Sequence, residues 1–385
     1  MILLIIILLI VLLFFVVLYG TDLFMNKFSE FRRFHIGRWK SHDDWSSAVE
    51  NKAIQWLKHT PTVKQTDNCR YVLIDMLKGS YRNETIQSWQ IAGLVLGLSA
   101  SDRAETREAV ANWKKTLLDN KGNWKRLIYK VDFAMLAYAL LKSTSVEQYE
   151  EIRPAMDEVV KMIESHLTSE GIISYSEGKN ANRYFVDTLG MVCPFLSLYG
   201  RIYHKPQYTR LALKQLHYFS RNGMLEQTML PCHAIDADSH LPLSLFGWGR
   251  GTAWYVFGLI DSYSELEDSN DKEELRQFIF SAANSYKVFQ NTDGGFCTIL
   301  QGGGVYESSV TAVMAYFYRV CAEVFGNSEY KAVSDRCLER LMKATMRDGA
   351  IDCCQGDTHG IGSFSQTFDI MPFAQGMALR GIRVI

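Results

Sequence analysis

Asp187 is the residue whose setting points most directly to acid/base chemistry. It is the only carboxylate in the stretch YFVDTLGMVCPFLSLY, residues 184–199, whose other side chains leave almost no polar face. This pattern predicts a helix surrounded by protein, and a carboxylate in the first turn of such a helix is costly to bury unless it is paired or used. The structural alternative is a helix cap, because Asp near a helix N-terminus complements the helix dipole.

Further polar and aromatic residues in the chain have types that suit the same chemistry. They are Asp132, His233, Trp248, Arg250 and Trp254. Carboxyl and imidazole groups move protons, the planar fork of Arg binds carboxylates, and indole rings offer flat apolar faces. The structural alternatives are a helix cap for Asp132 and a hydrogen-bonded loop residue for His233. For Arg250 the alternative is an ion pair, and for Trp254 it is core packing.

The elements that must position these residues are helices. Apolar residues recur with a period near 3.6 and strand-like alternation is scarce. Helices are expected near 45–58, 85–98, 103–118, 131–142, 146–167, 184–200, 206–222, 250–265, 271–290, 308–325, 329–345 and 370–380. Short breaks rich in Gly, Asn and Asp separate them, such as Asp293-Gly294-Gly295. Twelve helices joined by short turns predict six hairpins closed into a ring, an all-α (α/α)6 toroid.

Inner and outer helices of such a ring differ in composition. The helices at 131–142, 184–200, 250–265 and 308–325 are apolar on nearly every side, as inner helices should be. Those at 103–118, 146–167, 271–290 and 329–345 are amphipathic and charged, as outer helices should be. The N-termini of inner helices open on one side of the ring. Asp132, Asp187, Arg250 and Trp254 lie near such ends, so we expect them to converge on a single cleft.

Several segments of the sequence resemble the motifs of a known family. WGRG at 248–251, followed by Trp254, resembles the WGRGNGW signature of glycoside hydrolase families 88 and 105, the unsaturated uronyl hydrolases. The segment YFVDTLGMVCPFL, the ESS motif at 307–309 and PFAQG at 372–376 resemble further landmarks of that family. The resemblance covers roughly residues 45–385. Thr252-Ala253 replaces the usual Asn-Gly, which bears on substrate preference and activity.

The resemblance implies a hydrolase that removes a 4,5-unsaturated uronic acid from the non-reducing end of an oligosaccharide. An Asp protonates C4 of the enol ether and activates the water that adds at C5, so one acid/base residue suffices. Asp187 takes that role, with its pKa raised by burial and by a nearby Asp132, and Asp132 orients substrate or water. Arg250 and His233 hold the substrate carboxylate or hydroxyls, and Trp248 and Trp254 stack on the sugar. No cofactor is implied.

Other readings of the same residues remain open. A sugar epimerase on the same toroid would need two histidines across the cleft as proton carriers. His233 and His359 are the available pair. A glycan-binding protein without turnover is motivated by Thr252-Ala253. The DAD run at 236–238 resembles a glycosyltransferase DxD, but the strand–helix alternation of such enzymes is missing. Glu307 is interpreted as a charge near a helix N-cap and is not counted with the site.

The first forty-odd residues are set apart from the toroid. Residues 2–19 are uninterruptedly apolar and span about 27 Å as a helix, close to a bilayer core. No Lys or Arg precedes the run and no small-x-small site follows it, so an uncleaved single-pass anchor is preferred to a secretion signal. We expect an anchor at 1–20, a basic linker at 21–44 and a catalytic domain at 45–385. Positive charges after the anchor place that domain in the cytoplasm; they are Lys27, Arg32, Arg33, Arg38 and Lys40.

Composition limits the remaining classes of function. The net charge is −1 and 22% of residues are charged, so no basic excess points to nucleic acid. The eight cysteines form no CxxC framework and sit mostly in apolar stretches, which predicts buried free thiols in a reducing compartment. Cys353-Cys354 and Cys232-His233 lack a second ligand pair at metal spacing, so no metal site is expected.

Overall fold

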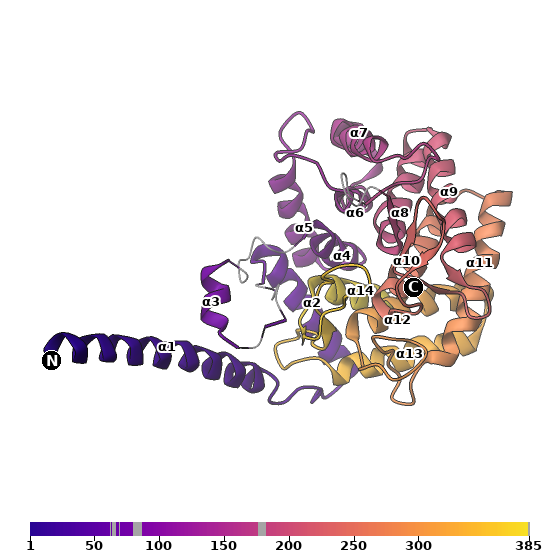
Figure 1. The fold of residues 1–385 in the computed structure, drawn as a ribbon. Coiled ribbons are helices and arrows are strands. Elements are labelled where there is room, and N and C mark those ends of the chain that lie inside the picture. The colour runs from indigo at the N-terminus through magenta and orange to yellow at the C-terminus, as the bar shows by residue number, and fades with distance from the viewer. Residues whose placement is uncertain (62, 64–66, 69, 80–86, 176–181, 384–385) are drawn as a thin grey trace.

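Two concentric rings of helices form the body of the protein (Figure 1). The computed structural model describes residues 1–385 except 62, 64–66, 69, 80–86, 176–181 and 384–385. The inner ring is α4 (Ser88–Ser99), α6 (Phe133–Lys142), α8 (Val186–Ile202), α10 (Gly249–Glu265), α12 (Ser308–Phe325) and α14 (Pro372–Arg383). The outer ring is α2 (His42–Lys58), α5 (Ala104–Leu117), α7 (Tyr149–Ser165), α9 (Pro206–Asn222), α11 (Asn270–Tyr286) and α13 (Ser328–Lys343). The (α/α)6 toroid and all twelve predicted helices are confirmed.

The inner helices form a closed ring because each packs against the next and α14 returns to α4. The closing contact is between backbones: a Cβ added to Gly376 on α14 would lie only 1.9 Å from the carbonyl oxygen of Gly93 on α4. The outer helix α2 precedes the ring in sequence but packs on α14. Gln375 fixes this joint, because its Nε2 donates to the carbonyl oxygens of Val49 (2.9 Å) and Gly349 (2.8 Å). The PFAQG motif is therefore the closure of the ring.

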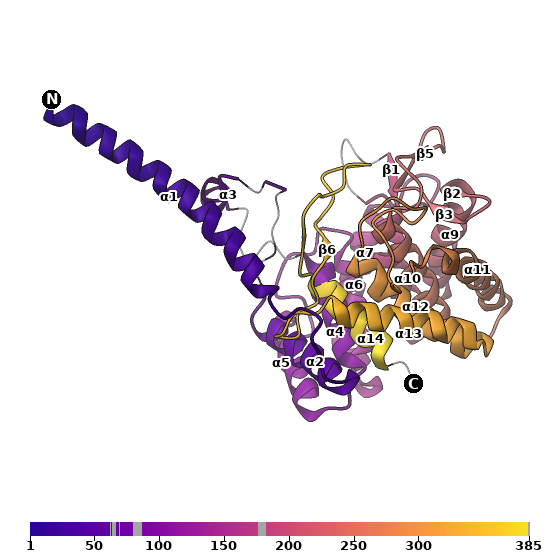
Figure 2. The same cartoon turned by 90° about the horizontal axis from the view of Figure 1, so that it is seen from below.

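Short strands lie at one end of the toroid, opposite the end at which α14 finishes (Figure 2). β1 (Arg183–Phe185), β4 (Ala234–Asp236) and β5 (Pro242–Leu243) form an antiparallel sheet in the order β1-β4-β5. β2 (Met224–Leu225) pairs with β3 (Leu230–Pro231), and β6 (Cys354–Gln355) pairs with β7 (Phe368–Asp369). These strands belong to the connections that enter inner helices, so they fix the side chains at the inner N-termini.

The N-terminal helix α1 (Ile2–Arg32) projects from the toroid as a separate rod (Figure 1). Within the described residues it is the one helix long and apolar enough to cross a membrane, and nearly all of its apolar side chains are exposed. The helix does not end with the apolar run but continues through Arg32, into the segment expected to be a linker. A short helix, α3 (Val72–Leu77), lies beside it.

The cysteines that the structure describes are all free thiols. Five are buried, at 193, 232, 321, 337 and 354, and Cys297 and Cys353 are partly exposed. The prediction of unpaired thiols is therefore confirmed for these seven, while Cys69 lies outside the described residues.

Candidate active site

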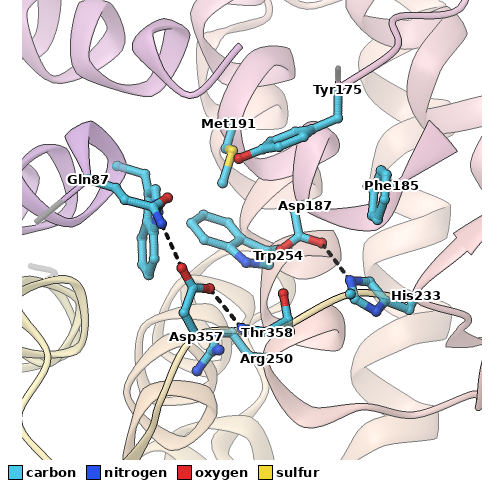
Figure 3. Close-up of a pocket in the computed structure, with 12 residues that line it drawn as sticks. Gln87, Tyr175, Phe185, Asp187, Met191, His233, Arg250, Trp254, Asp357 and Thr358 are labelled. Atoms are coloured by element: carbon cyan, nitrogen blue, oxygen red, sulfur yellow. Dashed lines mark hydrogen bonds and ion pairs between the residues drawn. The ribbon is translucent and has the colours of Figure 1, made fainter. Parts of the chain in front are cut away.

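A cavity of about 280 Å³ opens at the N-terminal ends of the inner helices. Of the four residues expected to converge there, Asp187, Arg250 and Trp254 line it, whereas Asp132 does not. Figure 3 shows its lining, which joins inner helices to the β6–β7 loop. The lining residues are Gln87, Trp89, Tyr175, Phe185, Asp187, Met191, His233, Arg250, Trp254, Asp357, Thr358 and Gly360. Of the six side chains singled out from the sequence, Asp187, His233, Arg250 and Trp254 line this cavity.

Asp187 and His233 are brought together by the pairing of β1 with β4. Phe185 and Ala234 are partners in this ladder, and the backbone N–H of Val186 donates to the carbonyl oxygen of His233 (3.0 Å). Asp187 follows in the first turn of α8, so its carboxylate turns toward the imidazole. The Oδ2 atom of Asp187 lies 3.7 Å from Nε2 of His233.

The carboxyl group of Asp187 keeps its proton up to nearly neutral pH. Its side chain is only 17% exposed, and its buried Oδ2 makes no hydrogen bond to the described residues. Burial raises the pKa of Asp187 to about 7, because desolvation penalises the charged form. The positive charge of Arg250 acts in the opposite direction, and the negative charge of Asp357 raises the pKa further. Asp187 therefore has the pKa of a general acid at neutral pH.

His233 is held neutral beside this acid. Burial, together with the charge of Arg250, lowers the pKa of His233 to about 4. The backbone N–H of Gly362 donates to its Nδ1 (3.3 Å), so the neutral ring carries its proton on Nε2, the nitrogen that faces Asp187. Rings on two sides fix the imidazole: its centroid lies 5.5 Å from that of Phe185 and 4.7 Å from that of Trp248.

Arg250 is anchored by the β6–β7 loop. Its Nη1 donates to the carbonyl oxygen of Gln355 (2.6 Å) and its Nη2 donates to that of Gly356 (2.6 Å). The guanidinium also lies over the ring of Trp248, 5.2 Å from the centroid. Arg250 thus ties the start of α10 to the loop that carries Asp357, and its positive charge faces the cavity without an acidic partner among the described side chains.

The two tryptophans of the GWGRGTAW run have different places. Trp254 lines the cavity and packs against Trp89 and Phe373, with ring centroids 5.4 Å and 4.8 Å away. Trp248 is not among the lining residues; it lies behind His233, stacks on Phe364 at 5.0 Å and donates from Nε1 to Oε1 of Gln355 (3.1 Å). A sugar in this cavity can therefore meet the indole of Trp254, whereas Trp248 supports His233 and the loop.

Asp132 lies just before α6 with a buried side chain. It makes no side-chain capping bond, and its buried Oδ1 has no hydrogen-bond partner among the described residues. Burial raises its pKa, while Lys130 and Arg126 lower it. The expectation that Asp132 raises the pKa of Asp187 is wrong, because the acid that acts on Asp187 is Asp357. Asp132 instead shares a neighbour with Asp187, since both carboxylates raise the pKa of the partly buried Tyr175 hydroxyl.

Sequence reasoning missed the residues that loops bring to the cavity. Asp357 accepts a hydrogen bond from Nε2 of Gln87 (2.6 Å), and Oε1 of Gln87 accepts one from Nε1 of Trp89 (2.7 Å), as Figure 3 shows in part. Gln87 immediately precedes α4 and Asp357 follows β6. Tyr175 and Phe185 complete the opposite wall. The polar run QGDTHG at 355–360 was the available signal, but nothing in it distinguishes a site from a surface loop.

Other candidate residues have structural roles. Glu307 caps α12, because its carboxylate accepts from the backbone N–H groups of Ser309 and Val310 (2.9 Å each), as interpreted from the sequence. It also accepts from the N–H of Gln355 (3.0 Å), so the ESS motif holds the same strand as Arg250. His359 is 42% exposed and its Nε2 lies 3.2 Å from a carboxylate oxygen of Asp67.

The DAD run and Thr252-Ala253 contribute no side chain to the lining of the cavity. In the DAD run, Asp236 binds Arg183 and accepts from Ser239, so it stabilises a turn. Thr252 and Ala253, which replace the family's Asn-Gly, are fully buried inside α10 and are not lining residues. Among the described side chains, no group of three or more His, Cys, Asp or Glu is placed to hold a metal ion.

The closed double ring of helices with a buried acid at the inner N-termini suits a glycoside hydrolase of the toroidal class. The sequence profile of glycosyl hydrolase family 88 matches residues 71–380, and the chain belongs to this family. Among curated proteins, none matches the chain in sequence.

Solved structures share the fold at low sequence identity. A possible member of family GH105 from Salmonella enterica superposes with a TM-score of 0.72 at 18% identity, covering 90% of this chain and 94% of the other. An unsaturated glucuronyl hydrolase specific for heparin gives 0.67 at 14%, covering 88% and 96%. The unsaturated glucuronyl hydrolase of Bacillus sp. GL1, responsible for the degradation of glycosaminoglycan, gives 0.63 at 16%, covering 87% and 94%.

Proposed function

We propose that this hydrolase removes a 4,5-unsaturated uronic acid from the non-reducing end of polysaccharide-derived oligosaccharides. The observation that carries the proposal is the carboxyl group of Asp187, which lies in the cavity wall with a pKa of about 7. The glucuronyl hydrolases that share the fold support the same substrate class.

The reaction needs one group that first donates and then accepts a proton. The Asp187 carboxyl protonates C4 of the C4=C5 bond, and the positive charge that develops at C5 is shared with the ring oxygen. The ionised Asp187 then takes a proton from a water that adds to C5. The resulting hemiketal opens by cleavage of the bond between C5 and the ring oxygen, which leaves a ketone at C5 and a hemiacetal at C1. The hemiacetal then collapses to an aldehyde and releases the remaining sugar as an alcohol, which takes up the hydroxyl proton. A single carboxyl serves both steps, in contrast to the two carboxylates of ordinary glycosidases.

The other lining residues suit a planar, negatively charged sugar. Arg250 places a positive charge at the cavity, which favours the uronate carboxylate. The neutral Nε2–H of His233 donates a hydrogen bond to a substrate hydroxyl or to the attacking water. Asp357 and Gln87 offer further hydrogen bonds, and Trp254 offers an apolar wall. In this proposal Asp132, whose charge acts on the lining residue Tyr175, orients substrate or water.

We further propose that α1 anchors the enzyme in a membrane as a single pass. Its length and apolar composition support this, and a secretion signal is the alternative. Cytoplasmic placement of the toroid remains the prediction from the charges after the anchor. Arg32 and Arg33 also pair with toroid carboxylates, so these two charges have a structural reason besides topology.

The experiment uses the full chain in detergent micelles with lyase-generated unsaturated disaccharides from pectin, glycosaminoglycans and alginate. The conjugated enol ether absorbs in the near ultraviolet, so loss of absorbance reports hydration of the C4=C5 bond. We expect loss with at least one uronate class and none with the saturated disaccharide. Absence of loss across all three classes contradicts the proposal and favours a divergent glycosidase or a glycan-binding protein.

A further inference from the structure

The N-terminal helix makes specific polar contacts with the toroid, although its first part projects away from it (Figure 2). Residues 1–70 lie outside the family match, which begins at residue 71. Two of these contacts involve charged side chains, Asp22 within α1 and Arg33 at its C-cap. Each reaches a different segment that leads to the cavity.

Arg33 holds both ends of the β6–β7 hairpin. Its Nε and Nη2 donate to the two carboxylate oxygens of Asp352 (2.5 and 3.1 Å), and Nη2 also donates to the carbonyl oxygen of Phe368 (3.0 Å). The side chain of Asp352 is 0% exposed. Asp352 lies just before β6 and Phe368 lies on β7. A paired guanidinium at a buried carboxylate is a strong fixed contact, and its loss leaves an uncompensated buried charge.

Asp22 holds the segment that precedes α4. Its two carboxylate oxygens accept from the backbone N–H groups of Tyr71 and Val72 (2.8 Å each), where α3 begins. The ring of Tyr19 on α1 lies 6.0 Å from the ring of Tyr71. Asp22 is itself buried, so α3 is fastened to the helix immediately after its apolar run.

The two fastened segments meet at the cavity. Asp67 accepts from Oγ of Ser365 (2.5 Å) and from the backbone N–H of Gln366 (2.9 Å), which joins the segment before α4 to the β6–β7 loop. Further along the same two segments, Gln87 donates to Asp357 (2.6 Å), and both residues line the cavity. The helix therefore contacts both the hairpin that carries Asp357 and the segment from which Asp67 binds the β6–β7 loop.

We propose that the N-terminal helix is a positioning element of the active site, in which Arg33 holds the hairpin that carries Asp357 and Asp22 holds the segment from which Asp67 binds the same loop. Neither residue touches the substrate in this arrangement. The contacts alone support the role of the helix in ordering the loop at the site. Its effect on turnover rests on the proposed function. Because α1 also carries the apolar span, a change in how that span is held would change the geometry of the cavity.

The first test measures backbone amide exchange in the full-length protein in detergent micelles. Arg33→Ala should speed exchange within 354–369 at least about tenfold. The substitution removes the two bonds to the buried Asp352 carboxylate and the bond to the carbonyl oxygen of Phe368. Peptides from α9, whose described residues make no contact with Arg33, should exchange as in the wild type. The matched control is Lys27→Ala, which removes an exposed cation on the same helix whose ion-pair partner among the described residues is Glu30.

A second readout separates positioning from general stability. With Asp357 less well placed, its charge acts less on Asp187, so the pKa of Asp187 falls and the alkaline limb of kcat/KM moves to lower pH. Arg33→Lys restores one of the contacts and should lie between the wild type and Arg33→Ala in both readouts. Asp22→Ala should speed exchange at 70–78.

Unchanged exchange at 354–369 in Arg33→Ala overturns the inference. The same holds if Lys27→Ala loosens these residues as much as Arg33→Ala does. If the wild type has no turnover on any unsaturated disaccharide, the proposed function fails, while the exchange experiment still decides the positioning role.

Discussion

The Nε2 atom of His233 lies 3.7 Å from the Oδ2 atom of Asp187. In this pair the carboxyl group, and not the imidazole, is the group that takes up the additional proton. An exposed pair would be Asp⁻ and His⁺ near pH 5.5. Here burial raises the pKa of Asp187 to about 7 and lowers that of His233 to about 4. Between these values the acid keeps its proton and the imidazole is neutral, which is the state that a proton donor to carbon requires.

The first prediction concerns pH. The carboxyl must be protonated to begin the reaction, so kcat/KM should fall as pH rises through about 7. Asp357→Asn removes a negative charge that penalises ionised Asp187, so the alkaline limb should move down by roughly half a pH unit. The measurement is a pH profile of kcat/KM for both proteins. Asp268→Asn removes a fully exposed carboxylate elsewhere and should leave the limb in place; an upward shift in Asp357→Asn contradicts the account.

Arg250 provides the second prediction. Lys cannot reproduce two guanidinium bonds to the carbonyl oxygens of Gln355 and Gly356, so one buried carbonyl loses its donor. Arg250→Lys should lose about 1–3 kcal/mol of stability and raise KM, because the loop and the cationic charge both move. Thermal unfolding and steady-state kinetics on the same samples measure the two effects. A raised KM with an unchanged unfolding temperature would mean that Arg250 acts on substrate alone.

The third prediction concerns the closure of the ring. A methyl group at Gly376 meets the backbone of Gly93, which cannot move as a flexible side chain does. Gly376→Ala should therefore destabilise the protein by about 1–3 kcal/mol or more. Gly20→Ala is the matched control, because a Cβ at Gly20 on α1 meets nothing within 4 Å. Equal unfolding temperatures for the two variants would contradict the close backbone contact.

The helices were predictable because burial imposes a strong pattern on them. Residues such as Leu189, Val192 and Leu196 are buried on all sides of α8, so the sequence of this inner helix lacks a polar face. The extension of α1 beyond Tyr19 was missed because residues 20–32 leave the apolar pattern and carry charges, which resembles a linker. Contacts such as those of Asp22 with the start of α3 and of Arg33 with Asp352 give this segment a fixed place.

The site was predictable where it lies on helices and unpredictable where it lies on loops. Asp187, Arg250 and Trp254 stand at inner N-termini, and the ring geometry alone brings them together. Asp357 and Gln87 depend on hydrogen bonds between segments distant in sequence, which leave no periodic signal. For the same reason Asp132 was taken as the acid that acts on Asp187, although Asp357 has that place.

The measurement that tests the central claim most directly compares the wild type with Asp187→Asn in the near-ultraviolet assay, with substrate binding followed in parallel. Asn is close in shape but cannot donate and then accept a proton. The account predicts that the wild type consumes the enol ether, that Asp187→Asn loses roughly 10²–10⁴-fold or more in turnover, and that the variant still binds substrate and stays folded. Turnover in Asp187→Asn within tenfold of the wild type would show that another group protonates the substrate.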